Sequence, residues 1–269
     1  MGKIERLEEI LKALKSVVIA YSGGLDSTFL LKMAVDTLGK ENVIAVTARS
    51  ETYPSSEYRS AVECAKYIGA KHITIKTKEL DIRNFRSNPV NRCYYCKREL
   101  FKKLDDMRKA RAFDYVLDGT NIDDLKDVRF GRKAAEELGV KSPLLKARIT
   151  KDDIRLFSKG LNLPTWDKAS FACLASRIPF NSAIDKKVLA KIEKAEDFFR
   201  QLGVRQVRVR AHKDIARIEV EESDFDKVLK MKKIIIKKLR KLGFVYITLD
   251  LLGYRTGSLH EALQIDKKM

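Results

Sequence analysis

Residues 16–27 read SVVIAYSGGLDS, and this stretch decides the fold. The apolar run at 16–21 is typical of a buried strand, and residues 27–38 follow a helical pattern that ends at Gly39. Between them, Gly23 and Gly24 allow a sharp turn whose backbone N–H groups can face a phosphate at the start of a helix. The sequence therefore predicts a nucleotide-binding turn.

The polar side chains of this turn favour a magnesium nucleotide. Ser22 and Ser27 can add hydroxyl donors, and Asp26 suits a Mg²⁺ ion held between phosphates. The turn lacks the lysine of a Walker A loop, G-x-x-x-x-G-K-[ST]. The structural alternative is an ordinary strand-to-helix turn without a ligand.

The first half of the chain alternates strand and helix patterns, which predicts an α/β fold with a doubly wound parallel sheet. The expected strands are residues 16–21, 42–48, 71–76 and 115–118. The expected helices are residues 27–38, 55–68, 93–109 and 127–138, with a shorter one after Thr150, whose hydroxyl can pair with Asp153 in a capping box.

The periodicity fails at residues 163–182, which form an irregular connector that contains Trp166 and Cys173. Beyond it we expect a helix at 184–202, strands at 204–211 and 216–221, a helix from Ser223 to residue 242 and a strand at 244–251. The predicted domains are residues 1–182, including the connector, and a small α+β domain at 183–269.

Composition limits the classes of function. The 269 residues are 45% hydrophobic, and the longest apolar runs fall far short of the roughly 20 residues of a membrane helix. The charged N-terminus does not resemble a signal peptide, so we predict a cytoplasmic protein without a membrane partner. The formal charge of +18 fits a nucleic acid, a phosphorylated substrate or a Lys/Glu-rich surface, and alone it does not choose among them.

The order serine, two glycines, any residue, aspartate, serine at 22–27 resembles the fingerprint of PP-loop ATP pyrophosphatases. This resemblance implies that ATP is cut between its α and β phosphates, that a substrate is adenylated and that pyrophosphate leaves. The ATP-binding residues expected from the motifs are Ala20, Tyr21, Ser22, Gly23, Gly24, Leu25, Asp26, Ser27, Ala48, Arg49, Gly119, Thr120, Asn121, Ser176 and Arg177.

Five further segments narrow the resemblance. They are TARS at 47–50, NRCYYCK at 91–97, DGTNIDD at 118–124, ACLASRIP at 172–179 and GYRTGS at 253–258. Together they resemble the LarE family of sulfur transferases over residues 5–260, and the only departure noted is Phe130 where the family often has proline. The resemblance implies a homo-oligomer that adenylates a carboxylate of pyridinium-3,5-biscarboxylic acid mononucleotide and inserts sulfur, on the way to the nickel-pincer nucleotide.

The cysteines suggest how sulfur arrives. Cys93 and Cys96 have the spacing of a ligand pair, and the family's three-cysteine branch implies a 4Fe-4S cluster on Cys93, Cys96 and Cys173 that carries an extra sulfide. In many relatives the cysteine at the position of Cys173 instead gives up its own sulfur. A zinc site and a redox dithiol remain alternatives, while Cys64 is expected to be a packed core thiol.

Arg208 and Arg210 are two apart on an expected strand, so both should project from one face and suit a phosphate monoester. The alternative is a wet strand face with incidental arginines. The resemblance implies an arginine pair for the substrate phosphate and an acidic residue at the position of Glu196, although that glutamate is also expected to be solvated if it has no such role.

Three other functions compete with this one. A tRNA thiolation enzyme would use the basic charge for RNA, but no appended RNA-binding domain is visible, which makes nucleic acid the weaker partner. An NAD synthetase would not need the three cysteines. A regulatory nucleotide-binding protein would release no pyrophosphate.

Overall fold

The computed structural model describes residues 2–125, 130–169, 171–259 and 261. The chain forms two compact units, Met1–Phe85 with Asn91–Phe171, and Arg86–Val90 with Ala172–Met269. The contacts thus divide the chain between Phe171 and Ala172, whereas the sequence predicted a boundary after residue 182. Cys173 and its neighbours belong by contacts to the second unit.

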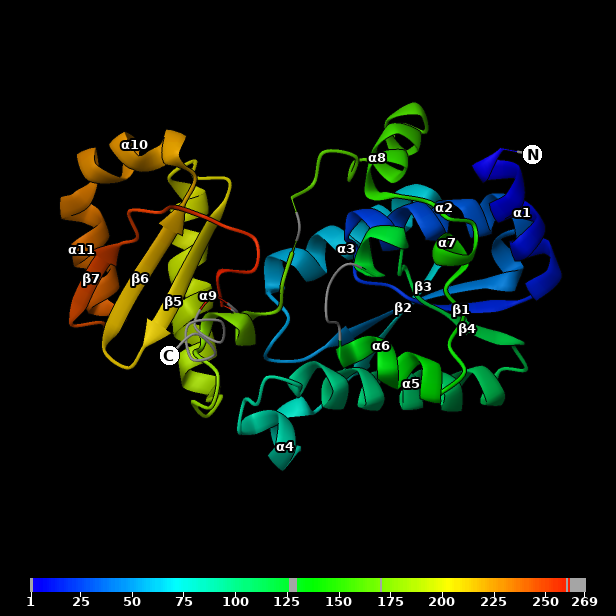
Figure 1. Ribbon diagram of the computed structural model, residues 1–269, viewed down its shortest axis with the longest axis horizontal. Coiled ribbons are helices and arrows are strands. Elements are labelled where there is room, and N and C mark those ends of the chain that lie inside the picture. The colour runs from blue at the N-terminus through cyan, green and yellow to red at the C-terminus, as the bar shows by residue number, and fades with distance from the viewer. Residues whose placement is uncertain (1, 126–129, 170, 260, 262–269) are drawn as a thin grey trace. The chain divides into compact units, whose positions relative to one another are not determined.

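The first unit is built on a parallel sheet with the strand order β3-β2-β1-β4 (Figure 1). The strands are β1 (Val17–Ala20), β2 (Val43–Arg49), β3 (Lys71–Lys76) and β4 (Tyr115–Leu117). Each expected strand is present, within two residues of its predicted ends. Because β1 pairs with β2 on one side and β4 on the other, it occupies the centre of the sheet.

Side chains that alternate along β1 enter two different cores. Val17 and Ile19 pack in the core formed with α1 (Lys3–Leu14), α2 (Leu25–Leu38), α3 (Ser55–Ile68), α7 (Pro143–Lys146) and α8 (Lys151–Gly160). Val18 enters the other core, with α5 (Arg92–Ala110) and α6 (Phe130–Glu137). Helices therefore cover both faces, as Figure 1 shows, and the predicted doubly wound fold is confirmed.

Other helical pieces were harder to predict. Helix α1 was not predicted from the sequence, yet Leu7 and Leu11 of this helix are fully buried. The expected helix at 127–138 begins in residues outside the described ranges, and its described part is α6. Short pieces are α4 (Arg83–Arg86) and the 3-10 turns η1 (Lys40–Asn42), η2 (Glu79–Asp81), η3 (Ile122–Leu125), η4 (Leu174–Arg177) and η5 (Glu222–Asp224).

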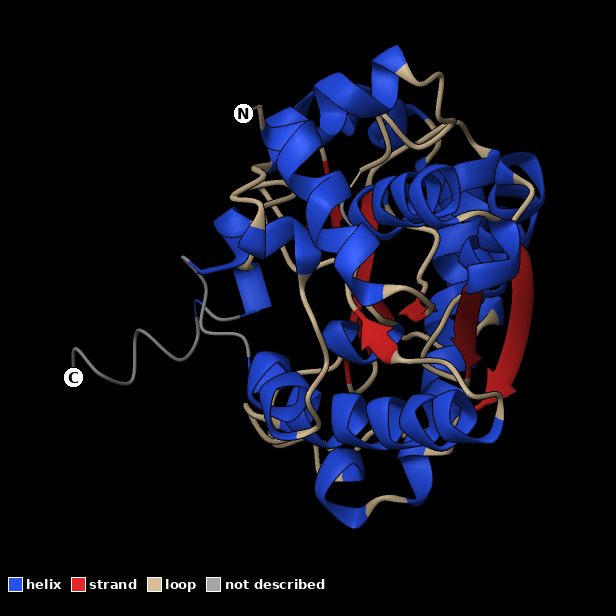
Figure 2. Ribbon diagram, turned by 90° about the vertical axis from the view of Figure 1, so that its right-hand side faces the viewer, coloured by secondary structure: helices blue, strands red, loops and turns tan. Residues whose placement is uncertain are grey.

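The second unit is a small α+β unit. Its strands β5 (Val207–His212) and β6 (Ile215–Val220) are antiparallel, and β7 (Tyr246–Leu249) runs parallel to β6. Helix α9 (Lys186–Gln201) packs on β5. Figure 2 separates these helices and strands by colour.

One expected helix of this unit is wrong. Residues 223–242 form α10 (Phe225–Lys230) and α11 (Lys232–Lys241) instead of a single helix. Met231 interrupts them with φ −91° and ψ +10°, a backbone conformation outside the α region. Residues 223–242 contain no glycine or proline, and their apolar pattern continues across Met231. The sequence pattern therefore did not indicate two separate helices.

The described ranges contain no helix with the length and apolar character that a bilayer crossing requires.

The capping box expected at Thr150 is present at the start of α8. The Thr150 hydroxyl accepts a hydrogen bond from the Asp153 N–H, and the Asp153 carboxylate accepts one from the Thr150 N–H. Both bonds satisfy N–H groups that the first helical turn leaves without a helical partner.

We expect Thr150→Ala to lower the free energy of unfolding by about 1 kcal/mol, because the loss of an N-cap hydroxyl typically has this cost. Urea unfolding followed by circular dichroism measures the change. Thr256→Ala, at an exposed turn position, is the control and should change stability by less than about 0.5 kcal/mol. Equal losses in the two variants would contradict the role of the cap.

Candidate functional site

The turn at residues 21–27 follows β1 and includes the first three residues of α2. The Ser27 hydroxyl lies 3.1 Å from the Ser22 hydroxyl, accepts a hydrogen bond from the Ser22 N–H and donates one to the Gly24 carbonyl. Helix α2 begins at Leu25, two residues earlier than expected, so Asp26 lies in its first turn. The helix N-terminus and the serine hydroxyls therefore surround the same small turn.

Gly23 is required by both conformation and space. Its φ is +62°, and a Cβ atom there would lie only 2.5 Å from the Cβ of Ala61 on α3. A side chain would thus be strained and would also collide with the helix behind the turn. This close approach fixes the turn against α3.

The loop after β4 meets the same helix start. A Cβ atom at Gly119 would lie 3.1 Å from the backbone nitrogen of Ser27, so the loop backbone packs directly on the first turn of α2. The Asp118 carboxylate shapes this loop by accepting hydrogen bonds from the Thr120 hydroxyl at 2.8 Å and the Ser142 hydroxyl at 2.7 Å. Asn121 is fully buried, and its side-chain oxygen accepts a bond from the Asp123 N–H.

The structure thus brings together two of the predicted groups, the turn and the 119–121 loop. Both follow the carboxyl ends of adjacent strands, β1 and β4, which is the edge where open α/β sheets bind ligands. The third group, Ala48 and Arg49, ends the neighbouring strand β2. Arg49 is exposed, and its guanidinium carbon lies 4.9 Å from the centre of the Tyr58 ring.

Two residues at the turn escaped the sequence analysis, Tyr53 and Lys168. The Tyr53 hydroxyl donates to the Ser22 carbonyl at 2.8 Å, and the Lys168 ammonium donates to the Gly23 carbonyl at 3.0 Å. Neither lies in a recognisable motif with the turn, since one follows β2 and the other lies in the connector. Lys168 follows the buried Thr165 by three residues in an irregular segment, so no helical or strand periodicity pointed to it.

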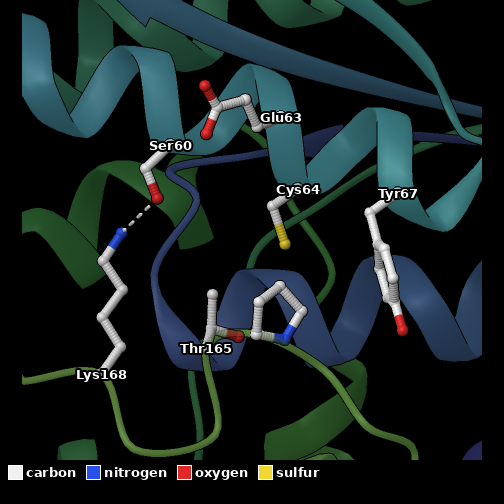
Figure 3. A pocket seen from close by; sticks show the side chains of 7 residues that line it. Ser60, Glu63, Cys64, Tyr67, Thr165 and Lys168 are labelled. Carbon is white, nitrogen blue, oxygen red and sulfur yellow. Dashed lines mark hydrogen bonds between the residues drawn. The ribbon is translucent and has the colours of Figure 1, made fainter.

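Lys168 also borders a pocket of about 290 Å³ behind the turn (Figure 3). Figure 3 shows its ammonium reaching Ser60 on α3, with Cys64 further along that helix. The Cys64 side chain is buried, as expected, and burial raises the pKa of its thiol, which favours the protonated form. The pocket therefore holds a core thiol and not a thiolate.

Cys93 and Cys96 lie one turn apart at the start of α5. Cys93 is exposed, and the Cys96 thiol, which is half-buried, lies 3.8 Å from a carboxylate oxygen of Glu79. Within the described ranges, no three His, Cys, Asp or Glu side chains gather as possible ligands of one metal ion. The two cysteines lie in the first unit and Cys173 in the second.

Cys173 caps η4 in the second unit, next to Ser176 and Arg177. The Ser176 hydroxyl and the Arg177 guanidinium both donate to the Cys173 carbonyl, at 2.8 and 3.1 Å. Arg177 is 1% exposed, and its other donors reach Glu196 in a two-bond pair at 2.8 and 3.0 Å. In the second unit, Arg177 therefore fixes the backbone that carries Cys173.

Glu196 is fully buried on α9, so the alternative of a solvated carboxylate is wrong. Burial alone would raise its pKa, but Arg177, Arg208 and the Val209 N–H together lower the pKa below its ordinary value. Helix α9 packs on β5, which removes this face of the helix from water. The helical charge pattern of the sequence did not reveal this.

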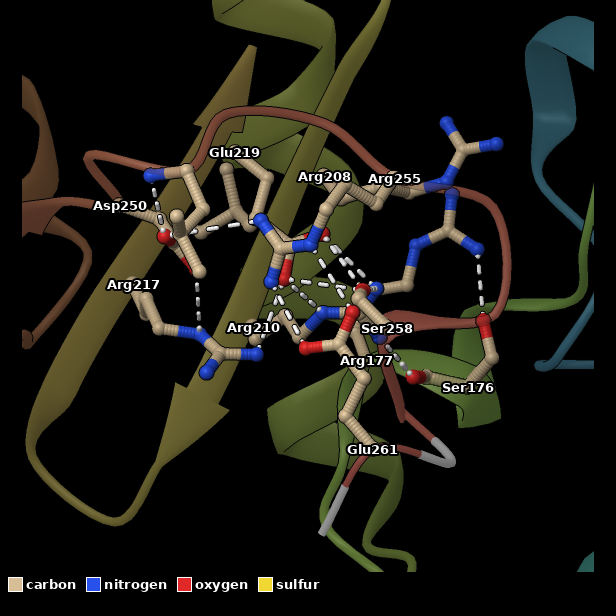
Figure 4. Close-up of polar contacts among 12 residues, drawn as sticks. Ser176, Arg177, Arg208, Arg210, Arg217, Glu219, Asp250, Arg255, Ser258 and Glu261 are labelled. Atoms are coloured by element: carbon tan, nitrogen blue, oxygen red, sulfur yellow. Dashed lines mark hydrogen bonds and ion pairs between the residues drawn. The ribbon is translucent and has the colours of Figure 1, made fainter. Parts of the chain in front are cut away.

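The alternative of a wet strand face at Arg208 and Arg210 is also wrong, because both arginines are buried. Arg210 makes two bonds to Glu219 and also donates to the Ser176 carbonyl at 2.7 Å and the Ser258 hydroxyl at 2.6 Å. Arg208 lies with its guanidinium carbon 5.2 Å from the centre of the Tyr254 ring. Figure 4 shows these groups converging from β5, β6 and η4.

In the second unit, these arginines and glutamates form one network next to the loop that carries Cys173. Its members are Ser176, Arg177, Glu196, Arg208, Arg210, Glu219 and Ser258, and we call it the arginine network. Glu219 is fully buried at the centre of the network. Arg255 instead pairs with Glu261 at the surface.

The chain is similar to known proteins over most of its length. Residues 5–112 match the family model described as NAD synthase. A pyridinium-3,5-bisthiocarboxylic acid mononucleotide synthase of Lactiplantibacillus plantarum is 37% identical over 253 residues, which cover 94% of this chain and 92% of that protein. Uncharacterized proteins of Synechocystis sp. and Methanocaldococcus jannaschii are 40% and 34% identical, over 97% and 90% of this chain and 98% and 92% of their own lengths.

We expect Gly23→Ala to destabilise the protein by about 1–3 kcal/mol more than Gly69→Ala, since overpacking adds to the strain of a positive φ. Gly39 has φ +80° and nothing lies within 4 Å of its Cβ position, but its ψ of 148° strains an alanine there as well. Gly69→Ala is therefore the matched control, because Gly69 has φ +77° in the αL region and open space at its Cβ position. Urea unfolding of the variants measures the differences. Equal stability would show that Ala61 does not restrict the turn.

We expect Glu196 to contribute to the pH dependence of stability. Its pKa is lower in the folded protein, so its contribution is present in full above the unfolded-state pKa of about 4.3 and is lost as the pH falls toward the folded-state value. Glu196→Gln should flatten this part of the curve of unfolding free energy against pH. Asp197→Asn, at an exposed neighbour on α9, is the control, and an unchanged slope in Glu196→Gln would refute the assignment.

Proposed function

Because this chain belongs to the LarE family of PP-loop, ATP-dependent sulfur transferases, we propose that its substrate is pyridinium-3,5-biscarboxylic acid mononucleotide. In this proposal the enzyme adenylates a carboxylate of the substrate and converts it to a thiocarboxylate. The observation that carries the proposal is the match to the Lactiplantibacillus plantarum synthase, which spans both units and 92% of that protein.

The turn at residues 21–27 is the proposed ATP site. Its support is the start of α2 at Leu25, the two serine hydroxyls and the close approach of Gly119. A helix N-terminus and backbone N–H groups stabilise phosphate charge. A Mg²⁺ ion that bridges the phosphates would be held near Asp26, which lies in the first turn of α2.

The proposed chemistry has two substitution steps. A carboxylate oxygen of the substrate attacks the α phosphorus of ATP, forms an acyl adenylate and expels pyrophosphate. A sulfur nucleophile then attacks the carboxyl carbon and expels AMP, which takes the former carboxylate oxygen with it. Adenylation is needed because an unactivated carboxylate is a poor electrophile.

The arginine network is the proposed site for the substrate phosphate, so Ser176 and Arg177, which the motifs placed among the ATP-binding residues, are assigned to the substrate in this proposal. Three buried arginines, Arg177, Arg208 and Arg210, face two buried glutamates, Glu196 and Glu219, which leaves an excess of positive charge. Burial, with Arg177 close by, lowers the pKa of Arg208, as expected for a cation that would gain from an anion. A phosphate dianion would supply that charge.

The sulfur source is proposed to be a 4Fe-4S cluster held by Cys93, Cys96 and Cys173. The first two residues fit this role, since their thiols lie one helical turn apart and Cys93 is exposed. When bound, such a cluster would carry an additional sulfide to the acyl adenylate. Cys173 is the proposed third ligand, on a loop where its carbonyl accepts hydrogen bonds from Ser176 and Arg177.

The rival source of sulfur is Cys173 itself, which would lose its sulfur in a single turnover. Its thiol is half-exposed, so the structure is compatible with that role as well. The two sources differ in their dependence on Cys93 and Cys96, which only the cluster requires.

The decisive experiment is anaerobic purification followed by turnover with ATP, sulfide and the pyridinium substrate. We expect iron and acid-labile sulfide in the wild type, repeated turnovers, and loss of iron in Cys93→Ala, Cys96→Ala and Cys173→Ala. Asp26→Asn should abolish substrate-dependent pyrophosphate release and keep the iron, because it changes only the nucleotide site.

Cys64→Ala is the matched control, since Cys64 is buried and has no part in the proposal. An iron-free wild type whose mass falls by one sulfur at Cys173 after a single turnover would refute the cluster and keep the adenylation. Absence of pyrophosphate release with this substrate, but stoichiometric and salt-sensitive tRNA binding, would replace the substrate with RNA.

A further inference from the structure

A phosphate-binding turn works only if its N–H groups point toward the ligand. In a trans peptide the carbonyl of one residue and the N–H of the next lie on opposite sides of the C–N bond. A group that binds the carbonyl from one side therefore directs the following N–H to the other side. Two consecutive carbonyls of this turn, those of Ser22 and Gly23, are bound in this way.

Tyr53 binds the first carbonyl. Its hydroxyl donates to the Ser22 carbonyl at 2.8 Å, and its ring packs edge-to-face on Phe171 with the ring centres 5.9 Å apart. Burial and the nearby Glu57 raise the pKa of the Tyr53 hydroxyl, so it stays protonated and remains a donor. The Ser22 carbonyl is thereby held, and the N–H of Gly23 faces the other way.

Lys168 binds the second carbonyl. Its ammonium donates to the Gly23 carbonyl at 3.0 Å and to the Ser60 hydroxyl at 3.2 Å, and it pairs with Glu57 at 2.8 Å. The two hydrogen bonds use two of the three donors of the ammonium, and the Glu57 carboxylate lies beside it as the opposite charge. The side chain is 18% exposed, so the charged hydrogen bond to Gly23 is largely shielded from water.

The backbone of Gly23 leaves this peptide little freedom to turn. Its φ of +62° and its contact with Ala61 hold it against α3, which also carries Ser60 and Glu57. The N–H of the next residue, Gly24, makes only a long contact of 3.4 Å with the Ser22 hydroxyl. A phosphate oxygen could replace that contact without moving the backbone.

We infer that Tyr53 and Lys168 are positioning residues that hold two carbonyls of the turn and so direct the Gly23 and Gly24 N–H groups toward the phosphates of ATP. The inference rests on the proposed ATP site and adds two residues that touch the turn from outside it. Neither touches a reacting atom. Their effect should therefore appear in the affinity for nucleotide and not in the affinity for the carboxylate substrate.

The test is isothermal titration with α,β-methylene ATP, which cannot be cleaved at the bond between the α and β phosphates, and steady-state pyrophosphate release. We expect Tyr53→Phe to weaken nucleotide binding about 10-fold and Lys168→Met between about 10-fold and 100-fold, as for the loss of a neutral and of a charged hydrogen bond. The KM for ATP should rise by similar factors. The KM for the carboxylate substrate should stay within about twofold of the wild-type value, which is less than the loss of a hydrogen bond would cause.

The matched control is Lys227→Met. Lys227 also donates to the carbonyl of a positive-φ glycine, Gly203, at 2.8 Å and has an acidic neighbour in Asp224. It lies in the second unit, whereas the turn belongs to the first. Its loss should leave nucleotide affinity unchanged, whereas a general loss of stability would affect all three variants.

Two outcomes separate the possible failures. If the wild type binds α,β-methylene ATP and both Tyr53→Phe and Lys168→Met bind it equally well, the positioning role is refuted and the ATP site stands. If the wild type does not bind it, the proposed ATP site fails and the inference fails with it. Should Lys168→Met not fold, Tyr53→Phe decides, since it removes a single oxygen atom.

Discussion

The burial of β1 on both faces is the constraint from which the first unit follows. Val17 and Ile19 enter one core and Val18 the other, so helices must cover both sides of the sheet. The same central position places the end of β1 beside the ends of β2 and β4. The turn that follows is therefore enclosed by loops from its neighbours, and its shape is set by packing against α3 and Gly119 as much as by its own glycines.

The second unit relies on a different kind of interaction. The Arg177–Glu196 and Arg210–Glu219 pairs are buried, where the desolvation of two charges offsets much of their mutual attraction. Such pairs contribute more to a unique geometry, through fixed hydrogen-bond directions, than to net stability. Here they tie η4, α9, β5 and β6 together, and the loop with Cys173 is positioned as a result.

The sequence predicted the parallel sheet, the capping box and the turn, because each depends on residues close together in the chain or on simple periodicity. It did not predict the break at Met231 or the burial of Glu196, since both depend on packing against distant elements. Tyr53 and Lys168 were missed for the same reason: their partners are backbone carbonyls, which have no signature in a sequence. The alternation at Arg208 and Arg210 indicated a shared face but not its burial.

The pairing of β1 with β4 also affects the order of events during synthesis. Val17 pairs with Tyr115, so the central strand lacks one of its two partners until the chain has been made as far as Tyr115, well after β2 and β3. Parallel strands that are distant in sequence associate slowly, and an edge left open meanwhile can pair with other chains. Until β4 is in place, this edge of β1 has no strand partner, so unintended strand pairing can begin there.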